Sequence, residues 1–229
     1  MRENPGPGPA EPWAFLRGLQ QISFCDWPGR VSCVLFLGGC NLACPTCHNW
    51  QLAQDFGQLP IIPKDSLFAH LQSRQDWLDG VVISGGEPTC CPGLDCMLQE
   101  LAAVGLPIKL DTNGLDPATI KDLLIRDLVQ LIAVDVKGPW PKYPLLSGGK
   151  CSAEQAESAL EQIFALSKEY PQRFYFRCTK VPALNSEDIE ETRSYLPQGF
   201  ELHPQDYVPP AQNEAAAKQP IYQQDCTTK

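Results

Sequence analysis

Three cysteines, Cys40, Cys44 and Cys47, have a spacing that suits an iron–sulfur cluster. They form a C-x3-C-x2-C pattern directly after an apolar run and two glycines. Electron-transfer clusters commonly use four cysteine thiolates, so a [4Fe–4S] cluster held by three keeps one iron open to an outside ligand. A zinc site with His48 as fourth ligand is the alternative, but His48 is the direct neighbour of Cys47, which hinders tetrahedral closure. The spacing therefore favours a reactive cluster over a structural zinc site.

Two glycines and an acid, Gly85, Gly86 and Glu87, end the next β-branched run along the chain. By itself, a glycine pair after a strand is an ordinary turn. Because glycine has no Cβ, it also lets the backbone come close to a bound ligand. This turn is therefore a candidate ligand-binding segment beside the cysteine loop.

Charged and amide side chains end the next two apolar runs, with Asp111 and Asn113 after the first and Asp135 and Lys137 after the second. Asparagine followed by glycine tolerates positive φ, so Asn113 also suits a plain turn. A plain turn does not account for the carboxylates of Asp111 and Asp135, because a carboxylate in apolar surroundings needs a partner. Lys137, a charged ligand or a bound cation could serve.

The elements that position these residues alternate between β-branched apolar runs and amphipathic helical segments, which predicts an α/β fold. Nearly continuous apolar strands are typical of a parallel sheet covered on both faces. Helix starts are marked by Asp116 before a proline, by the Ser152–Gln155 capping box and by Asn185 or Ser186. Strands are predicted over residues 31–37, 81–84, 107–111, 131–136, 173–179 and 200–203.

Six such βα units are too few for a closed eight-stranded barrel, which normally needs about 250 residues. The chain has 229 residues, and its first twelve are rich in Pro and Gly. We predict a partial TIM-type (β/α)6 barrel over residues 18–208, a disordered leader over 1–17 and a C-terminal tail over 209–229. Barrel enzymes place their chemistry at the C-terminal strand ends, where the candidate residues fall.

Charge and apolar content narrow the range of partners. The chain has 18 basic and 27 acidic residues, a net charge of −9 and no basic stripe, which speaks against a nucleic-acid partner. The longest apolar run, 31–37, is too short to span a bilayer, so no membrane partner is expected. The first residues lack the features of a signal peptide. We expect a cytoplasmic protein that acts on small molecules or on another protein.

Eleven cysteines are many for a cytoplasmic protein of this length. Disulfides are typical of oxidising compartments and the count is odd, so metal binding is favoured over a disulfide framework. Cys90, Cys91 and Cys96 lie close together in the sequence and could hold a further metal, although no fourth ligand is evident nearby. The alternative is that they are small apolar residues of the core.

The cysteine loop after an apolar strand resembles that of the radical S-adenosylmethionine (SAM) superfamily. The resemblance implies that Cys40, Cys44 and Cys47 hold a [4Fe–4S] cluster and that the open iron binds SAM. It also implies the radical SAM core fold and reductive cleavage of SAM to a 5′-deoxyadenosyl radical. Thr46 departs from the family pattern, in which an aromatic residue bordering the adenine precedes the third cysteine.

Later segments resemble the SAM-binding motifs of the same enzymes. The turn at 85–87 is similar to the GGE motif, which receives the methionyl amino group of SAM. Arg177 lies in a segment similar to one of the glycyl-radical activating enzymes and is a candidate for the SAM carboxylate, with a surface position as the alternative. Near the last predicted strand, His203 or Asp206 is a candidate for the ribose.

The stretches at 111–114 (DTNG) and 135–137 (D-x-K) look like the corresponding stretches of the glycyl-radical activating enzymes. In the pyruvate formate-lyase activating enzyme, positions like Asp111, Thr112 and Asp135 hold a monovalent cation beside SAM. The resemblance therefore implies SAM contacts in both stretches and a monovalent cation between them.

The sequence Cys47-His48-Asn49 reproduces the CHN that follows the triplet in the activating enzymes. The segments 18–23 and 26–30 resemble those before their first strand, most closely in anaerobic ribonucleoside-triphosphate reductase activating proteins. The resemblance covers about residues 18–208. It implies a glycyl-radical enzyme, such as anaerobic ribonucleotide reductase, as partner, with flavodoxin or ferredoxin as electron donor. Asp26 could touch the glycine-bearing loop of that partner, with a plain Pro-Gly turn as the alternative.

Two other functions stay open from the sequence. The first is a radical SAM enzyme that acts on a small molecule, similar to a deazapurine-forming synthase, with its substrate inside the barrel. The second is a non-catalytic iron–sulfur or zinc-binding module. Such synthases usually depart from the CHN context at 47–49, and the module gives no role to the turns at 85–87 and 111–114.

Overall fold

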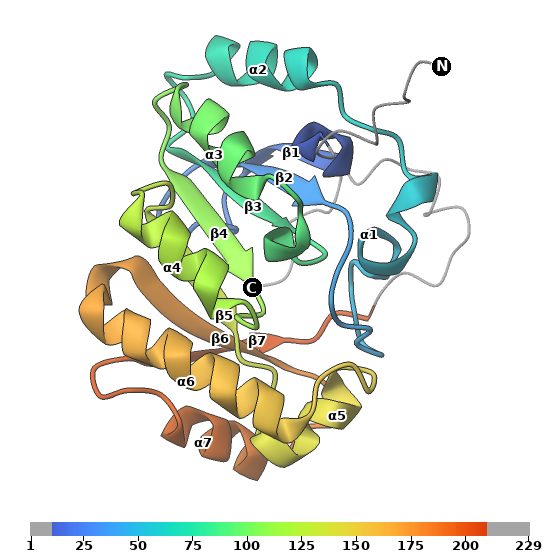
Figure 1. Cartoon of the computed structure of the whole chain (residues 1–229), viewed down its shortest axis with the longest axis vertical. Helices are drawn as coiled ribbons and strands as arrows, with labels where there is room; N and C mark the ends of the chain where they lie inside the picture. Colours follow the sequence, from blue (N-terminus) through green and yellow to red (C-terminus); the bar gives the residue numbers. More distant parts are fainter. Residues whose placement is uncertain (1–10, 210–229) are drawn as a thin grey trace, which may run out of the picture.

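One curved sheet of seven strands forms the centre of the fold, and helices cover its outer side (Figure 1). The computed structural model describes residues 11–209. The strands lie side by side in sequence order, β2 to β7 in parallel and β1 antiparallel to β2. Their bounds are β1 Leu16–Ser23, β2 Ser32–Leu37, β3 Gly80–Gly85, β4 Ile108–Thr112, β5 Leu131–Asp135, β6 Phe174–Lys180 and β7 Leu202–Asp206.

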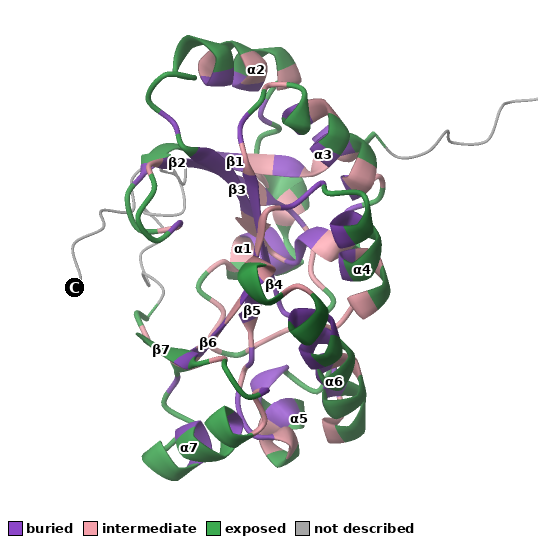
Figure 2. Ribbon diagram, turned by 90° about the vertical axis from the view of Figure 1, so that its left-hand side faces the viewer, coloured by how far each residue is buried: buried purple, intermediate pink, exposed green. Residues whose placement is uncertain are grey.

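The helices connect the parallel strands and lie mainly along one side of the sheet, as α3, α4 and α6 show in Figure 2. Their bounds are α1 Trp50–Gln54, α2 Lys64–Ser73, α3 Leu94–Ala102, α4 Pro117–Ile125, α5 Tyr143–Leu146, α6 Ala153–Glu169 and α7 Ser186–Ser194. Short 3-10 turns are η1 Pro12–Phe15, η2 Phe56–Gln58, η3 Pro88–Cys90, η4 Trp140–Lys142 and η5 Pro171–Arg173.

Side chains alternate between the two faces of each strand. On β2, Leu35 and Leu37 belong to the large core shared with the helices. Val34 belongs to a second, smaller cluster on the inner face, together with Trp27 and Val82. Burial on both faces explains why the parallel strands read as continuous apolar runs.

The predicted α/β partial barrel is confirmed, since each of the six predicted strands corresponds to one of β2 to β7. Helix α4 begins after Asp116, whose side chain accepts a hydrogen bond from Thr119 N. Helix α6 begins with the expected capping box of Ser152 and Gln155. Helix α7 begins after Asn185, which forms a similar box with Asp188.

The predicted leader is wrong for residues 12–17, which form η1 and the start of β1. Trp13 is buried and packs edge-on against Phe68, with ring centroids 5.5 Å apart. This contact fixes the segment against the helix layer. Residues 1–10 of the leader, and 210–229 of the predicted tail, lie outside the described residues.

Strand β7 begins two residues later than predicted and runs through Pro204 to Asp206. Proline cannot donate to a sheet ladder and is tolerated on an edge strand. β7 is an edge strand of the sheet, so Pro204 is compatible with its place there.

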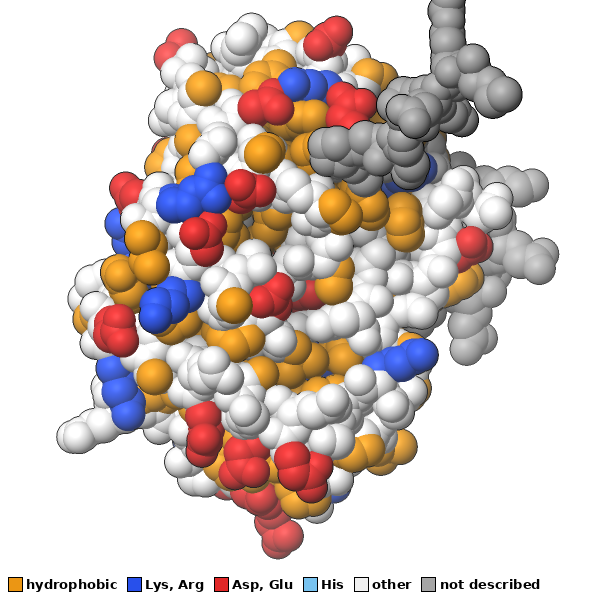
Figure 3. Space-filling view, viewed as in Figure 1, with side chains coloured by type: hydrophobic (Ala, Val, Ile, Leu, Met, Phe, Trp, Pro, Cys, Tyr) orange, Lys and Arg blue, Asp and Glu red, His pale blue; other side chains and the backbone are white. Residues whose placement is uncertain are grey.

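The described part of the chain has no helix long and apolar enough to cross a membrane. On the face drawn in Figure 3, Lys and Arg side chains are scattered among acidic ones.

Candidate active site

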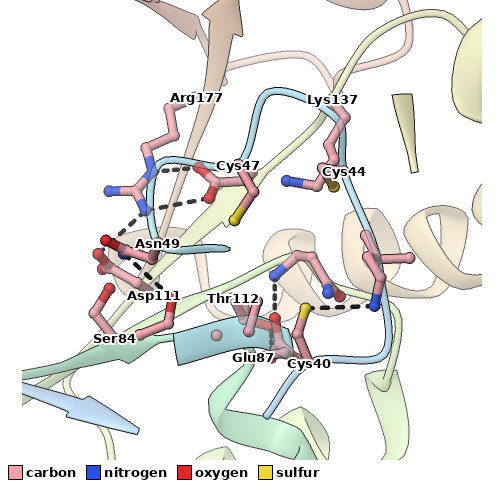
Figure 4. A pocket seen from close by; sticks show the side chains of 16 residues that line it. Cys40, Cys44, Cys47, Asn49, Ser84, Glu87, Asp111, Thr112, Lys137 and Arg177 are labelled. Carbon is pink, nitrogen blue, oxygen red and sulfur yellow. Dashed lines mark hydrogen bonds and ion pairs between the residues drawn. The ribbon is translucent and has the colours of Figure 1, made fainter. Parts of the chain in front are cut away.

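A cavity of about 150 Å³ lies at the C-terminal ends of the parallel strands (Figure 4). Residues from the cysteine loop and from the ends of β3, β4, β5 and β6 line it together. This is the end where barrel folds place their chemistry. The lining residues are Cys40, Leu42, Cys44, Cys47, Asn49, Ala53, Ser84, Gly85, Gly86, Glu87, Asp111, Thr112, Asn113, Asp135, Lys137 and Arg177.

Gly85 and Gly86 hold the cysteine loop by direct backbone contact. A Cβ on Gly86 would lie 2.1 Å from Gly39 O, and one on Gly85 would lie 2.3 Å from Leu37 O. Gly86 N donates to Leu37 O at 2.9 Å, and Glu87 N donates to Gly39 O at 2.8 Å. Both glycines are therefore needed for packing against the cysteine loop, a role distinct from the predicted approach to a ligand.

The Cys40, Cys44 and Cys47 thiols are partly buried and line the same cavity. Burial raises the pKa of the Cys40 thiol to about 12, and it also raises the pKa of Cys47. Metal binding to thiols releases their protons, so these groups become thiolates when iron is bound. The donor set of three sulfurs on one loop fits a [4Fe–4S] cluster with one open iron.

Within residues 11–209, no three His, Cys, Asp or Glu side chains converge closely enough to hold a single metal ion. A [4Fe–4S] cluster distributes its thiolates over several irons and does not require such convergence.

Glu87 joins the ends of β3 and β4. Its carboxylate is 1% exposed and accepts hydrogen bonds from Thr112 Oγ1 and Asn113 N, both at 2.7 Å, and from the Thr89 hydroxyl at 2.7 Å. Burial raises the pKa of Glu87, and these hydrogen bonds offset part of the effect. Glu87 thereby fixes the turn at 111–114 beside the cysteine loop, where Asn113 Nδ2 also donates to Asn41 Oδ1 at 2.8 Å.

Arg177 bridges the two strand-end carboxylates. Its Nη2 donates to Asp111 Oδ2 at 3.1 Å, and its Nε pairs with Asp135. Burial acts to raise the pKa of Asp135, but Arg177 and Lys137 hold it below its ordinary value. On the other side, fully buried Lys109 also pairs with Asp111. Two protein cations therefore balance the two carboxylates.

Lys137 extends into the cavity toward Cys44 (Figure 4). Burial alone would lower its pKa, yet Asp135 and the three nearby thiols raise it above its ordinary value. Among the described residues, its ammonium group has no hydrogen bond or ion pair. Lys137 is therefore a charged donor that is available to a ligand.

Two predicted site residues lie outside the cavity. His203 lies on β7 beside Arg177 in the register and is exposed, with its ring edge-on to Tyr175 at 5.9 Å. Asp26 accepts a hydrogen bond from the Ser23 hydroxyl in the loop before β2. That loop is at the opposite end of the strand from the cysteines.

Cys90 and Cys96 are exposed and Cys91 is buried; Cys90 ends η3, Cys91 follows it, and Cys96 lies in α3. Cys91 is part of the large apolar core, as the alternative interpretation expected.

Sequence reasoning missed Lys109 as a partner of Asp111. The signal was present, because residues i and i+2 of a strand share a face, which places Lys109 beside Asp111 inside the barrel. The roles of Asn41 and Asn49, which donate to or accept from neighbouring loops, leave no comparable signal in one sequence.

We expect Gly86→Ala to destabilise the protein by about 1–3 kcal/mol, because the added Cβ overlaps Gly39 O and the loop must shift. For a chain of this size, that corresponds to a Tm roughly 2–12 °C lower. Gly57→Ala is the matched control, since a Cβ there meets nothing within 4 Å. Thermal unfolding of both variants is the measurement, and equal Tm values would contradict the packing role of Gly86.

Comparison with known proteins gives relatives of two kinds, activating enzymes and a synthase. The chain is 32% identical over 185 residues to a Methanocaldococcus jannaschii protein named "Putative glycyl-radical enzyme activating enzyme MJ1227", covering 78% of this chain and 73% of the relative. It is 39% identical over 90 residues to 7-carboxy-7-deazaguanine synthase of Neisseria meningitidis serogroup B, 39% of each chain. It is 29% identical over 107 residues to the pyruvate formate-lyase-activating enzyme of Staphylococcus aureus, 43% of this chain and 41% of the relative.

Among solved structures, the fold is similar to native anSMEcpe with bound AdoMet, with a TM-score of 0.57 and 21% identity. The match covers 77% of this chain and 51% of that one, so the chain spans about half the length of that protein. A family model described as the radical SAM superfamily matches residues 34–196, and the chain therefore belongs to the radical SAM superfamily of enzymes.

Proposed function

We propose that this radical SAM enzyme installs a glycyl radical on a partner enzyme, as an activating enzyme. The observation that carries the proposal is the cavity that three thiols from one loop share with the ammonium group of Lys137. Identity of 32% to a protein named as an activating enzyme, over most of both chains, supports this choice of reaction.

The cluster thiolates in this proposal are Cys40, Cys44 and Cys47. When bound, the cluster and SAM would supply hydrogen-atom abstraction from the partner's glycine, with one electron from an external donor consumed as SAM is cleaved to methionine and a 5′-deoxyadenosyl radical. The residues of this chain position SAM and exclude water from the radical.

Lys137 is the proposed ligand of the SAM carboxylate, because Arg177 already contacts Asp111 and Asp135. Arg177 uses Nε and Nη2 for these contacts, so its Nη1 can still add a hydrogen bond to SAM. The backbone at 85–87 and the turn of Asn113 border the cavity from the other side and are proposed to contact the methionyl end of SAM.

Three further assignments are proposals with less direct support. His203 shares the inner face of the sheet with Arg177, which suits a ribose contact once SAM is bound. The contact of Asp26 with the partner's glycine-bearing loop rests on sequence resemblance alone, because Asp26 lies at the end of β2 opposite the cysteines. Anaerobic ribonucleotide reductase as the partner, and flavodoxin or ferredoxin as the electron donor, rest on sequence resemblance alone.

The proposal is tested by incubating the anaerobically reconstituted, reduced protein with SAM and candidate glycyl-radical enzymes. We expect 5′-deoxyadenosine and a glycyl doublet in the electron paramagnetic resonance (EPR) spectrum for one of them. Formation of 5′-deoxyadenosine without a doublet from any candidate would overturn the activating function.

A small-molecule reaction is the second candidate function, favoured by 39% identity to a 7-carboxy-7-deazaguanine synthase over 90 residues. In that case a small-molecule precursor of a 7-deazaguanine would increase 5′-deoxyadenosine formation, and a protein partner would not.

Lys137→Met is expected to weaken SAM binding by about 10-fold to 100-fold. A hydrogen bond to a charged group contributes roughly 1.5–3 kcal/mol, which corresponds to this change in Kd. Lys121→Met is the control, because Lys121 is exposed on α4. SAM titration followed by EPR measures both, and an unchanged Kd for Lys137→Met would contradict the assignment.

The contacts at Thr112 and at the two carboxylates speak against the monovalent cation that the family resemblance implies. The Thr112 hydroxyl already donates to Glu87, and Arg177 lies between the two carboxylates, so a cation would have to displace Arg177. We therefore expect the Kd for SAM to change less than about twofold when K⁺ is replaced by tetramethylammonium at constant ionic strength. A cation that contributed about 1.4 kcal/mol to SAM binding would instead change the Kd tenfold. A larger change would favour a cation site.

A further inference from the structure

We propose that the turn at Ser147 and Gly148, directly after α5, is a positioning element that sets the place of the cysteine loop relative to Lys137. The inference rests on the proposed cluster site at Cys40, Cys44 and Cys47. It assigns a role to a segment that carries no ligand of its own.

The turn contacts the loop between the first two cluster cysteines. Ala43 N donates to Ser147 O at 3.0 Å. A Cβ on Gly148 would lie only 2.1 Å from Ala43 O and 2.8 Å from Ala43 C. The two backbones are therefore in direct contact at the residue that precedes Cys44.

This contact differs from the other supports of residues 41–46. Leu42 O accepts from the side chain of Gln54 at 2.6 Å, and Asn41 accepts from the side chain of Asn113 at 2.8 Å. Within the described chain, the bond from Ala43 N to Ser147 O is the only hydrogen bond between main-chain atoms that joins residues 41–46 to another element. A side-chain support can change rotamer, whereas this one moves only if the backbone moves.

The turn itself is held firmly. Ser147 is fully buried, its Oγ accepts from Cys151 N at 3.1 Å, and its N donates to Tyr143 O at 2.8 Å. Gly149 N donates a hydrogen bond to Pro144 O at 2.7 Å. These bonds tie the turn to α5 and to the start of α6.

The same unit also fixes the backbone of Lys137. Tyr143 is 1% exposed, and its hydroxyl accepts a hydrogen bond from Lys137 N at 3.0 Å. Helix α5 and its turn thus support the cysteine loop on one side and the end of β5 on the other. A shift of the turn would change the separation between the open iron and the proposed carboxylate ligand of SAM.

The test compares Gly148→Ala with Gly149→Ala. Both glycines have positive φ, +66° and +75°, so both variants carry the same kind of backbone strain. Only Gly148 faces Ala43, since a Cβ on Gly149 meets nothing within 4 Å. In reconstituted protein, we expect Gly148→Ala to weaken SAM binding at least fivefold and to alter the EPR change caused by SAM. Gly149→Ala is expected to stay within twofold of the wild type.

A second readout is independent of the cluster. In cluster-free protein, hydrogen exchange at the amide of Ala43 is expected to be slow in the wild type and in Gly149→Ala, and faster in Gly148→Ala. If Gly148→Ala does not fold, Ser147→Ala replaces it, because losing Oγ loosens the turn without adding bulk. Equal SAM affinity and equal exchange in the compared variants would overturn the inference. A wild-type protein that binds no cluster would instead overturn the proposed function.

Discussion

Cys44→Ala is expected to eliminate 5′-deoxyadenosine formation from SAM. A cluster with only two protein thiolates at this loop loses its defined open iron, and the chemistry that the cofactor supplies cannot start. Iron bound after anaerobic reconstitution is expected to fall in parallel. The assay is quantification of 5′-deoxyadenosine after reduction in the presence of SAM.

The control for this loss is Cys96→Ala. Cys96 is also a free cysteine, but it is exposed and does not line the cavity. Its removal should leave both iron content and SAM cleavage unchanged. Retained cleavage in Cys44→Ala, or an equal loss in Cys96→Ala, would show that the cavity cysteines are not the cluster ligands.

Arg177→Leu should produce the largest loss of stability among the site variants, about 3 kcal/mol. Breaking a buried ion pair by removing one partner costs roughly 3–5 kcal/mol, and the lower end applies because Lys109 stays beside Asp111. The corresponding fall in Tm is roughly 6–12 °C for a chain of this length. Thermal unfolding of the cluster-free protein measures this without any contribution from SAM.

Arg126→Leu is the matched surface variant, because Arg126 also pairs with two aspartates, Asp95 and Asp122, near the surface. Such exposed pairs contribute little to stability, because water screens the charges. Adding Asp135→Asn to Arg177→Leu should recover part of the lost stability, since it removes the unpaired charge. Similar Tm values for Arg177→Leu and Arg126→Leu would contradict the bridging role.

The Arg177 effect should also depend on pH. The pKa of Asp135 is below its ordinary value, so its stabilising contribution is present above the unfolded-state pKa, about 3.9, and is lost as pH falls through the lower folded-state pKa. Without Arg177, burial acts on Asp135 with less compensation and its folded pKa rises. The stability difference between wild type and Arg177→Leu should therefore shrink as pH falls below about 4.

The parallel strands and helix starts could be predicted because they depend on local patterns. Continuous apolar runs marked β2 to β6, and Asp116 and Ser152 marked the starts of α4 and α6. Strand β1 escaped prediction because Gln20 and Gln21 interrupt its apolar pattern. β1 is an antiparallel strand at the edge of the sheet, and only some of its side chains are buried, so its sequence lacks a continuous apolar run.

The composition of the site could be predicted from spacing at strand ends, but its internal contacts could not. Two glycines at 85–86 suggested approach to a ligand, but the sequence did not reveal that their missing Cβ atoms also make room for Leu37 and Gly39. The bridge from Arg177 to both carboxylates depends on which strands are neighbours. That information is a property of the sheet order and is absent from any single segment.

The most direct test of the account is EPR with SAM that carries ¹⁵N in its amino group. In the reduced, reconstituted wild-type protein, we predict a magnetic coupling between the cluster and that nitrogen, because one iron lacks a protein thiolate and binds SAM. A cluster whose signal shows no such coupling and does not change when SAM is added would be fully ligated by the protein, and would contradict the account.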